Sequence, residues 1–310
     1  MKRIGASAPG KAVLCGEYAV LEGAPAVVAA VDRRVTVTWS DDPTSLPLEV
    51  LAALERAQAE CGPVPGSLML DSKELQDNRA KLGLGSSAAG AVAAAAAVFA
   101  THGRDLQDPA VMHRVFDCAL AGHATVAPSG SGVDVAASTF GGFLRFMRDA
   151  RGVETRALRP PAGLHIALVW TGHPARTSEL VAKVHQLRRH DPAQYERCMG
   201  ELSELAVSFA HAFESAGATE VVSAAARYCR AMGALGEASG APIVETRLGL
   251  AAELAARFSG SAKPCGAGGG DVAVAFFAGG DAAEAFELAC KEEGLRPIDV
   301  SWGAAGAMAC

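Results

Sequence analysis

The sequence has few aromatic residues, no excess of basic charge and no long uncharged apolar run. Aromatic residues make up 5% of the 310 positions, and 28 Lys and Arg stand against 34 Asp and Glu, which gives a net charge of −6. An acidic chain without patches of basic and aromatic residues argues against nucleic-acid binding. Without a bilayer-spanning run or an apolar leader at its N-terminus, the chain is expected to be soluble and cytoplasmic, with no membrane partner.

Two signatures of particular sites are also missing. The eight cysteines are scattered without a Cys-x-x-Cys pair, which favours reduced thiols packed as small hydrophobic residues in a cytosolic protein. The sequence contains no Gly-x-x-x-x-Gly-Lys-Ser/Thr segment, which excludes a Walker-type phosphate loop. A small anionic substrate stays possible, because local basic residues decide its binding rather than net charge.

Residues 82–90, Leu-Gly-Leu-Gly-Ser-Ser-Ala-Ala-Gly, are the most informative segment of the sequence. The alanine-rich run at 91–100 predicts a helix, and the Gly/Ser segment forms its first turn. A helix start offers N–H groups and partial positive charge, and glycines allow close approach, so the segment predicts a phosphate cradle. The residues also fit Gly-x-Gly-x-x-Ala of dinucleotide sites, but the charged stretch 71–81 precedes them instead of an apolar strand. Close packing of an alanine helix is the structural alternative.

The rest of the chain alternates helices and strands irregularly, which predicts an α+β fold. Period-two alternation at 31–39 predicts a half-buried strand, and the apolar runs 164–170 and 272–277 predict two more. Further strands are predicted at 67–71, 140–147 and 298–302. Helices are predicted at 48–59, 109–121, 245–258 and 282–293. Two more helices are predicted within 191–236, and another is predicted to begin at Thr177 as its cap. The charged, proline-rich segment 149–161 predicts a boundary between domains at 1–155 and 156–310.

Two other glycine-rich stretches are interpreted as loops that accompany the phosphate cradle. The first is Ala8-Pro9-Gly10-Lys11, leading into Gly16-Glu17-Tyr18, and the second runs from 263 to 271 and contains Gly-Ala-Gly-Gly-Gly. In this order and spacing, over residues 8 to about 277, the three motifs resemble those of the GHMP kinases. The resemblance implies an ATP-dependent, Mg²⁺-using kinase. It also implies an N-terminal domain with a ribosomal protein S5 domain 2-like fold and a C-terminal domain with a ferredoxin-like fold.

Finer features suggest the acceptor. The segments Gly16-Glu17-Tyr18 and Gly130-Ser131-Gly132-Val133-Asp134 resemble kinases that convert 5-phosphomevalonate to 5-diphosphomevalonate with the γ-phosphate of ATP. The segments 128–130 and 138–142 have more in common with mevalonate kinases, so mevalonate is the alternative acceptor. A decarboxylase of the same fold lacks the lysine equivalent to Lys11, and the intact glycine-rich motifs argue against a non-catalytic relative. A monomer and a homodimer are both compatible with the sequence.

The resemblance also implies roles for individual residues. Lys11 and Asp134 match the catalytic pair of the family. The ATP phosphates would be held by Gly83, Leu84, Gly85, Ser86, Ser87 and Ala88, with Ser87 also reaching Mg²⁺. Residues expected to bind the acceptor are Glu17, Tyr18, Ser131, Gly132, Arg176, Thr177, Gly268 and Gly269, of which Arg176 and Thr177 stand at a predicted helix start that suits an anion. The structural alternatives are a helix cap for Ser86 and a turn-forming side chain for Asp134.

A phosphate acceptor would change what is required of the catalytic pair. Its second pKa is about 6, so it is mostly ionised at neutral pH and needs a base less than an alcohol does. Repulsion between two anions is then the obstacle, and Lys11 is expected to offset it. Mevalonate kinases carry a Mg²⁺-binding glutamate about eleven positions before the aspartate, where this sequence has His123. Imidazole suits a hard cation poorly, so the metal would depend on Ser87, ATP and water, with His123 a helix-end residue.

Overall fold

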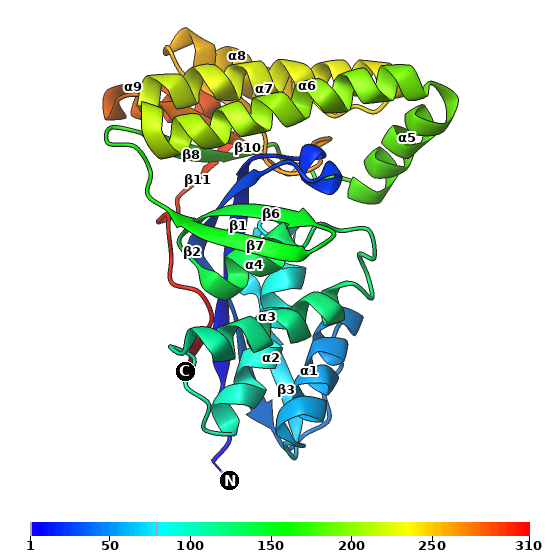
Figure 1. Cartoon of the computed structure of the whole chain (residues 1–310). Helices are drawn as coiled ribbons and strands as arrows, with labels where there is room; N and C mark the ends of the chain where they lie inside the picture. Colours follow the sequence, from blue (N-terminus) through cyan, green and yellow to red (C-terminus); the bar gives the residue numbers. More distant parts are fainter. Residues whose placement is uncertain (1, 78–79) are drawn as a thin grey trace. The chain divides into compact units, whose positions relative to one another are not determined.

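The computed structural model describes residues 2–77 and 80–310, and the chain divides into two compact units that alternate along the sequence (Figure 1). Unit 1 comprises Met1–Ala12, Val28–Leu144 and Ser301–Cys310, and unit 2 comprises Val13–Val27 and Arg145–Val300. Each unit is therefore built from segments that are distant in sequence. The predicted boundary after residue 155 stays a prediction.

In unit 1, strand β1 (Ala6–Cys15) lies between β12 (Met308–Ala309) and β2 (Ala26–Ser40), and β3 (Ser67–Asp71) also pairs with β2. All ten residues of β1 are buried. The prediction of a glycine-rich loop at 8–11 is therefore wrong, because these residues lie inside the strand. Pro9 has no N–H to donate to a neighbouring strand. It is tolerated because alternate residues of a strand direct their N–H groups to the same side, and on this side the N–H of Lys11 bonds the carbonyl of Leu84 rather than a strand.

Four helices of unit 1 pack on one another: α1 (Leu48–Cys61), α2 (Ser86–Thr101), α3 (Pro109–His123) and α4 (Val133–Phe140). The alanine run of α2 is buried on all sides, which suits small side chains at close helix contacts. Helix α4 was not predicted, because the turn residues before it indicated a loop. Gly132 takes the left-handed conformation there (φ 85°) and is the N-cap of the helix. Because the helix occupies residues up to Phe140, the following strand β6 spans Phe143–Asp149 rather than the predicted 140–147. Short elements complete the unit: 3₁₀ helix Lys73–Leu75, β4 (Gln76–Asp77) and β5 (Ala80–Lys81).

Unit 2 contains an antiparallel sheet with the strand order β11-β8-β10-β9, namely Arg296–Ile298, His165–Trp170, Val272–Phe277 and Ser261–Pro264. Helices pack on both of its faces, so β10 is apolar throughout. Phe277 packs in the apolar cluster with α8 (Thr246–Arg257) and α9 (Gly280–Glu292), whereas Phe276 makes an edge contact with Phe209 of α6 (Pro192–His211). The remaining elements are 3₁₀ helix Ala19–Glu22, β7 (Gly152–Leu158), α5 (Thr177–His190), α6 (Pro192–His211), a π-helical turn (Ala212–Ala216) and α7 (Ala218–Ser239).

The sequence predicted most of these elements, with further differences in unit 2. Strand β11 ends at Ile298, so the strand predicted at 298–302 is displaced from the observed one and shares only that residue with it. Strand β7 lies within the segment 149–161 that was interpreted as a boundary, and β9 includes Lys263, which was assigned to the third loop. The cap of α5 is Arg176 rather than Thr177, and no side chain caps that helix. The mixed α+β fold is confirmed.

Burial suppresses the ionisation of several thiols in this protein. All eight cysteines are free, and Cys310 is exposed. Burial raises the pKa of Cys118 and of Cys290 to about 12, so these thiols stay protonated at neutral pH. Across the described residues, every helix is too short or too polar to cross a membrane.

The contact between α1 and α3 predicts how two glycines respond to the same change. A Cβ at Gly122 of α3 would lie 2.6 Å from the backbone N of Ala53, whereas a Cβ at Gly200 of α6 would meet nothing within 4 Å. Gly122→Ala is expected to lower the free energy of unfolding by about 1–3 kcal/mol through overpacking. Gly200→Ala is expected to raise it by up to about 1 kcal/mol, because alanine is the better helix former. Chemical denaturation measures both, and equal stability of the two variants would contradict this account.

Candidate functional site

The phosphate loop, residues 83–88, begins helix α2 in unit 1. Gly83 (φ 75°) and Gly85 (φ 81°) take the left-handed conformation that favours glycine, and Gly85 is the N-cap of the helix. The interpretation of Ser86 as a side-chain cap is wrong, because no side chain caps α2. Leu84 is buried and anchors the loop, while Gly83, Gly85 and both serines are partly exposed. The first N–H groups of the helix lack intrahelical partners, so the loop can bind an anion.

Lys11 lies on β1 against this loop and is only 9% exposed. Its Nζ is 3.4 Å from the carbonyl oxygen of Gly83, and its backbone N donates to Leu84 O at 2.9 Å. The stem of Lys11 packs against Gly85, where a Cβ would lie 3.0 Å from Lys11 Cγ. Among the described residues Lys11 has no ion-pair partner. A buried ammonium without a counter-charge is costly, so this position favours a bound anion.

Asp134 lies in the first turn of α4 rather than in a loop. Its Oδ1 accepts from the backbone N of Val135 at 2.9 Å, and its Oδ2 lies 3.8 Å from Nε2 of His123. The Asp134 side chain is 26% exposed, so it stays reachable by a ligand. His123 ends α3, as predicted, but the sequence did not indicate that it faces Asp134. Ser131 accepts from Val133 N at 3.3 Å.

Ser87, the predicted Mg²⁺ ligand, has a partner that sequence reasoning missed. Its Oγ donates to Oε1 of Glu49 at 2.6 Å, and Glu49 is only 9% exposed. Glu49 comes from the first turn of α1, so two helix starts meet at this contact. The signal in the sequence was an acidic residue at the start of a helix, which is too common to indicate a site. Serine and carboxylate oxygens are the kind of ligand that Mg²⁺ prefers.

In unit 2, Glu17 and Lys263 form a buried ion pair. Lys263 Nζ contacts Glu17 Oε1 at 2.5 Å and Pro264 O at 2.6 Å, with side-chain exposures of 0% for Lys263 and 3% for Glu17. Glu17 Oε1 also accepts from Gly266 N at 3.2 Å, and the hydroxyl of Tyr228 donates to Glu17 O. This pair attaches the segment after β1 to the third glycine-rich loop. Lys263 was not singled out in the sequence.

Several residues predicted to bind the acceptor hold the third loop instead of pointing outward. The hydroxyl of Tyr18 donates to Ala267 O at 2.6 Å, and burial raises the pKa of Tyr18 well above its usual value. Gly269 N donates to Ile243 O at 2.9 Å, and a Cβ at Gly268 would lie 2.2 Å from the same oxygen. Four of the loop's amides, those of residues 265, 266, 269 and 271, are thus already bonded within the protein.

The start of α5 is the exposed part of the predicted acceptor set. Arg176 pairs with Glu179 at 3.2 Å, and Thr177 is exposed. The assignment of both to the acceptor stays a prediction, as does that of Glu17, Tyr18, Ser131, Gly132, Gly268 and Gly269.

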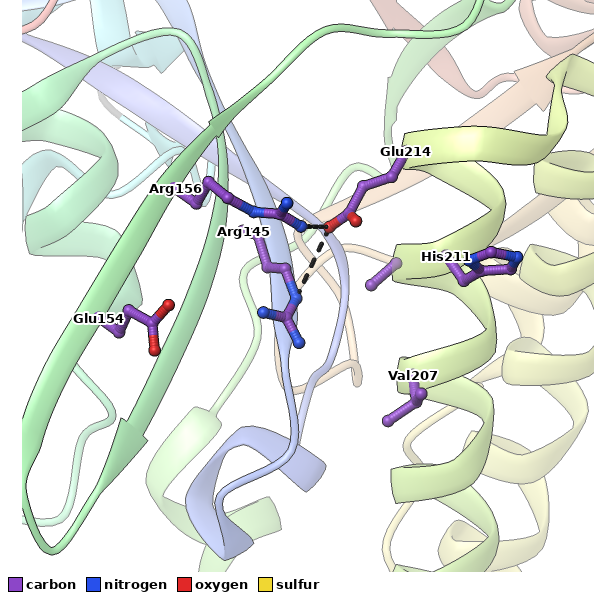
Figure 2. A pocket seen from close by; sticks show the side chains of 7 residues that line it. Arg145, Glu154, Arg156, Val207, His211 and Glu214 are labelled. Carbon is purple, nitrogen blue, oxygen red and sulfur yellow. Dashed lines mark ion pairs between the residues drawn. The ribbon is translucent and has the colours of Figure 1, made fainter.

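Unit 2 also has a cavity of about 430 Å³ that the sequence did not predict (Figure 2). Arg145 of β6 and Arg156 of β7 both pair with Oε1 of Glu214 in the π-helical turn, the Arg145 Nε at 3.6 Å. Since one carboxylate is shared by the two guanidinium groups, and Glu154 adds a second negative charge to the lining, the cavity carries little net charge. It is therefore a poorer anion site than the phosphate loop.

Comparison with known proteins agrees with the motifs. The model of the GHMP kinases N terminal domain matches residues 48–142. A phosphomevalonate kinase of Streptomyces sp. (strain CL190) is 31% identical over 86% of this chain and 88% of its own. A mevalonate kinase of Archaeoglobus fulgidus is 29% identical over 94% of this chain and 98% of its own. The structure of Streptococcus pneumoniae phosphomevalonate kinase in complex with phosphomevalonate and AMPPNP has a TM-score of 0.81 at 19% identity, over 96% of this chain and 99% of that one.

The chain therefore belongs to the GHMP kinase family, and the resemblance is confirmed. Within that family, its named relatives are kinases of the mevalonate pathway.

The buried pair in unit 2 generates a stability prediction. Lys263→Met leaves the Glu17 carboxylate buried without its counter-charge, which is expected to cost about 3–5 kcal/mol of the free energy of unfolding. Lys263→Met combined with Glu17→Gln removes both charges and is expected to recover part of that loss. Arg176→Ala breaks an exposed pair and serves as the control, with a cost below about 1 kcal/mol. Urea denaturation measures all three, and a double variant no more stable than Lys263→Met would refute the explanation.

Proposed function

We propose that this kinase transfers the γ-phosphoryl group of ATP to 5-phosphomevalonate and forms 5-diphosphomevalonate and ADP. The observation that carries the proposal is the ammonium of Lys11, which is buried against the phosphate loop without a carboxylate partner in the described part of the chain. A positive charge held in this way favours an anion beside Gly83–Gly85.

The reaction requires two anions to approach one another. An oxygen of the acceptor phosphate attacks the γ-phosphorus, the bond from that phosphorus to the β,γ-bridging oxygen breaks, and ADP leaves with the electron pair. Lys11 would offset the repulsion between the attacking and transferred groups, and the packing of its stem against Gly85 would keep the charge in place. The amides at the start of α2 would bind the phosphate chain of ATP.

The donor set at Ser87 fits Mg²⁺, because hydroxyl and carboxylate oxygens meet there within 2.6 Å. When bound, the ion would neutralise part of the charge on the phosphates of ATP. Ser87 would hold it, and the helix start would orient the nucleotide.

Two features favour phosphomevalonate over mevalonate. The relative from Streptomyces sp., at 31% identity, is a phosphomevalonate kinase. Position 123 carries a histidine beside Asp134, where mevalonate kinases are expected to have a glutamate. An acceptor that is already ionised needs no base to remove a proton from it. Such an acceptor is therefore compatible with an aspartate whose carboxylate is in contact with an imidazole. Mevalonate stays the second candidate because several relatives are mevalonate kinases.

An assay of the two acceptors side by side tests the substrate. ADP release is expected to be much faster with 5-phosphomevalonate than with mevalonate at equal concentration, and the product is expected to be a diphosphate by ³¹P NMR. Faster release with mevalonate would assign the chain to the second candidate. No release with either would reject both.

Substitutions at the catalytic pair test the roles of its members. Lys11→Met and Asp134→Ala are each expected to lower kcat by about 100-fold or more while nucleotide binding survives, as expected of groups that stabilise a transition state. Lys81→Met is the matched control, because Lys81 is an exposed lysine on β5 two residues before the phosphate loop. Wild-type kcat in the Lys11 and Asp134 variants, or an equal loss in Lys81→Met, would refute these roles.

A further inference from the structure

The carboxylate of Glu49 lies beside the phosphate loop, where a negative charge disfavours phosphate binding. Its Oε1 accepts from Ser87 Oγ at 2.6 Å, within the first turn of the helix that is proposed to bind the ATP phosphates. Its side chain is largely withdrawn from water, since the residue is 9% exposed. A carboxylate in such surroundings repels a polyphosphate strongly, because low solvent screening strengthens the interaction of like charges.

A divalent cation between the two anions removes this conflict. Glu49 has a second oxygen, Oε2, that has no hydrogen-bond or ion-pair partner among the described residues and is not sealed from solvent. Together with the Ser87 hydroxyl it provides hard oxygen donors, the kind that Mg²⁺ and Mn²⁺ bind. No cluster of three or more His, Cys, Asp and Glu side chains suited to a metal occurs within 2–77 and 80–310. The cation would therefore take its remaining ligands from phosphate oxygens and water.

We propose that Glu49 and Ser87 together are the protein ligands of the divalent cation that enters with the nucleotide. The inference rests on the proposed function, because without a polyphosphate on the loop two oxygen donors are too few to bind the ion firmly. It assigns the carboxylate ligand to the start of α1, on a different helix from His123 at the end of α3. The hydrogen bond from Ser87 keeps the two donor groups adjacent before the ion arrives.

A purely structural role for Glu49 makes a different prediction. An acidic residue in the first turn of α1 also stabilises that helix, whose N-cap Pro47 makes no side-chain cap. Under that role, removal of the charge would change stability but would leave the metal affinity of the nucleotide complex as it is. Metal binding and metal-free nucleotide binding must therefore be measured separately.

The experiment uses the full chain, Mn²⁺ and AMPPNP. Electron paramagnetic resonance gives the affinity of the protein–AMPPNP complex for Mn²⁺, and calorimetry in EDTA gives the affinity for metal-free AMPPNP. Glu49→Gln keeps the shape of the side chain and is expected to weaken Mn²⁺ binding by at least about 10-fold. The same variant is expected to bind metal-free AMPPNP as well as wild type or more tightly, because a repelling charge has been removed. Glu55→Gln, an exposed glutamate on the same helix, is the control and is expected to change neither.

Ser87→Cys gives an independent test should Glu49→Gln fail to fold. A thiolate favours a soft ion, so this variant is expected to lose affinity for Mn²⁺ and gain it for Cd²⁺. Wild-type Mn²⁺ affinity in Glu49→Gln, or loss of metal-free AMPPNP binding by that variant, would overturn the assignment of Glu49. An unchanged metal preference in Ser87→Cys would overturn that of Ser87. If the wild-type chain bound no AMPPNP with or without Mn²⁺, the proposed function itself would fail.

Discussion

The phosphate loop and strand β1 can approach one another because the loop has no side chain at the point of contact. Gly85 leaves room for the stem of Lys11, and the carbonyl of Leu84 accepts the backbone N–H of the same lysine. Leu84 itself is buried and holds the loop to the core of unit 1. A substituent at Gly85 would displace the ammonium that is proposed to act in catalysis. The chemistry therefore depends first on backbone packing and only then on charge.

Two buried lysines show how differently one residue type is used in this molecule. Lys263 in unit 2 meets a carboxylate, a carbonyl and the ring of Tyr228, so its charge is satisfied within the protein. Among the described residues, the side chain of Lys11 in unit 1 has one polar partner, the carbonyl of Gly83. The first is a structural ion pair that positions a loop. Lys11 has a positive charge that no carboxylate neutralises among the described residues, so the charge is available to a bound anion.

Sequence reasoning located the elements with strong local signals and missed those that depend on tertiary contacts. The alanine run and the apolar strand at 272–277 are specified by composition and period alone, and both were predicted correctly. The segment 8–11 was mistaken for a loop, since Pro9 and Gly10 are turn formers; burial on both sides keeps them extended. Glu49 could not be found from the sequence, because its meeting with Ser87 arises only when α1 packs on α2. His123 and Asp134 were each noted, but their proximity was not.

The guanidinium of Arg34 has a consequence for how the chain matures. It bonds the carbonyl oxygens of Ala305 and Gly306 and both the hydroxyl and the carbonyl of Ser7, and thereby joins residues 301–310 to the beginning of unit 1. During vectorial synthesis on the ribosome, the whole of residues 145–300 emerges before the carbonyl acceptors of Ala305 and Gly306 exist. The sheet edge at β1 therefore stays unpaired until β12 has been translated, although most of the sequence of unit 1 is synthesised earlier.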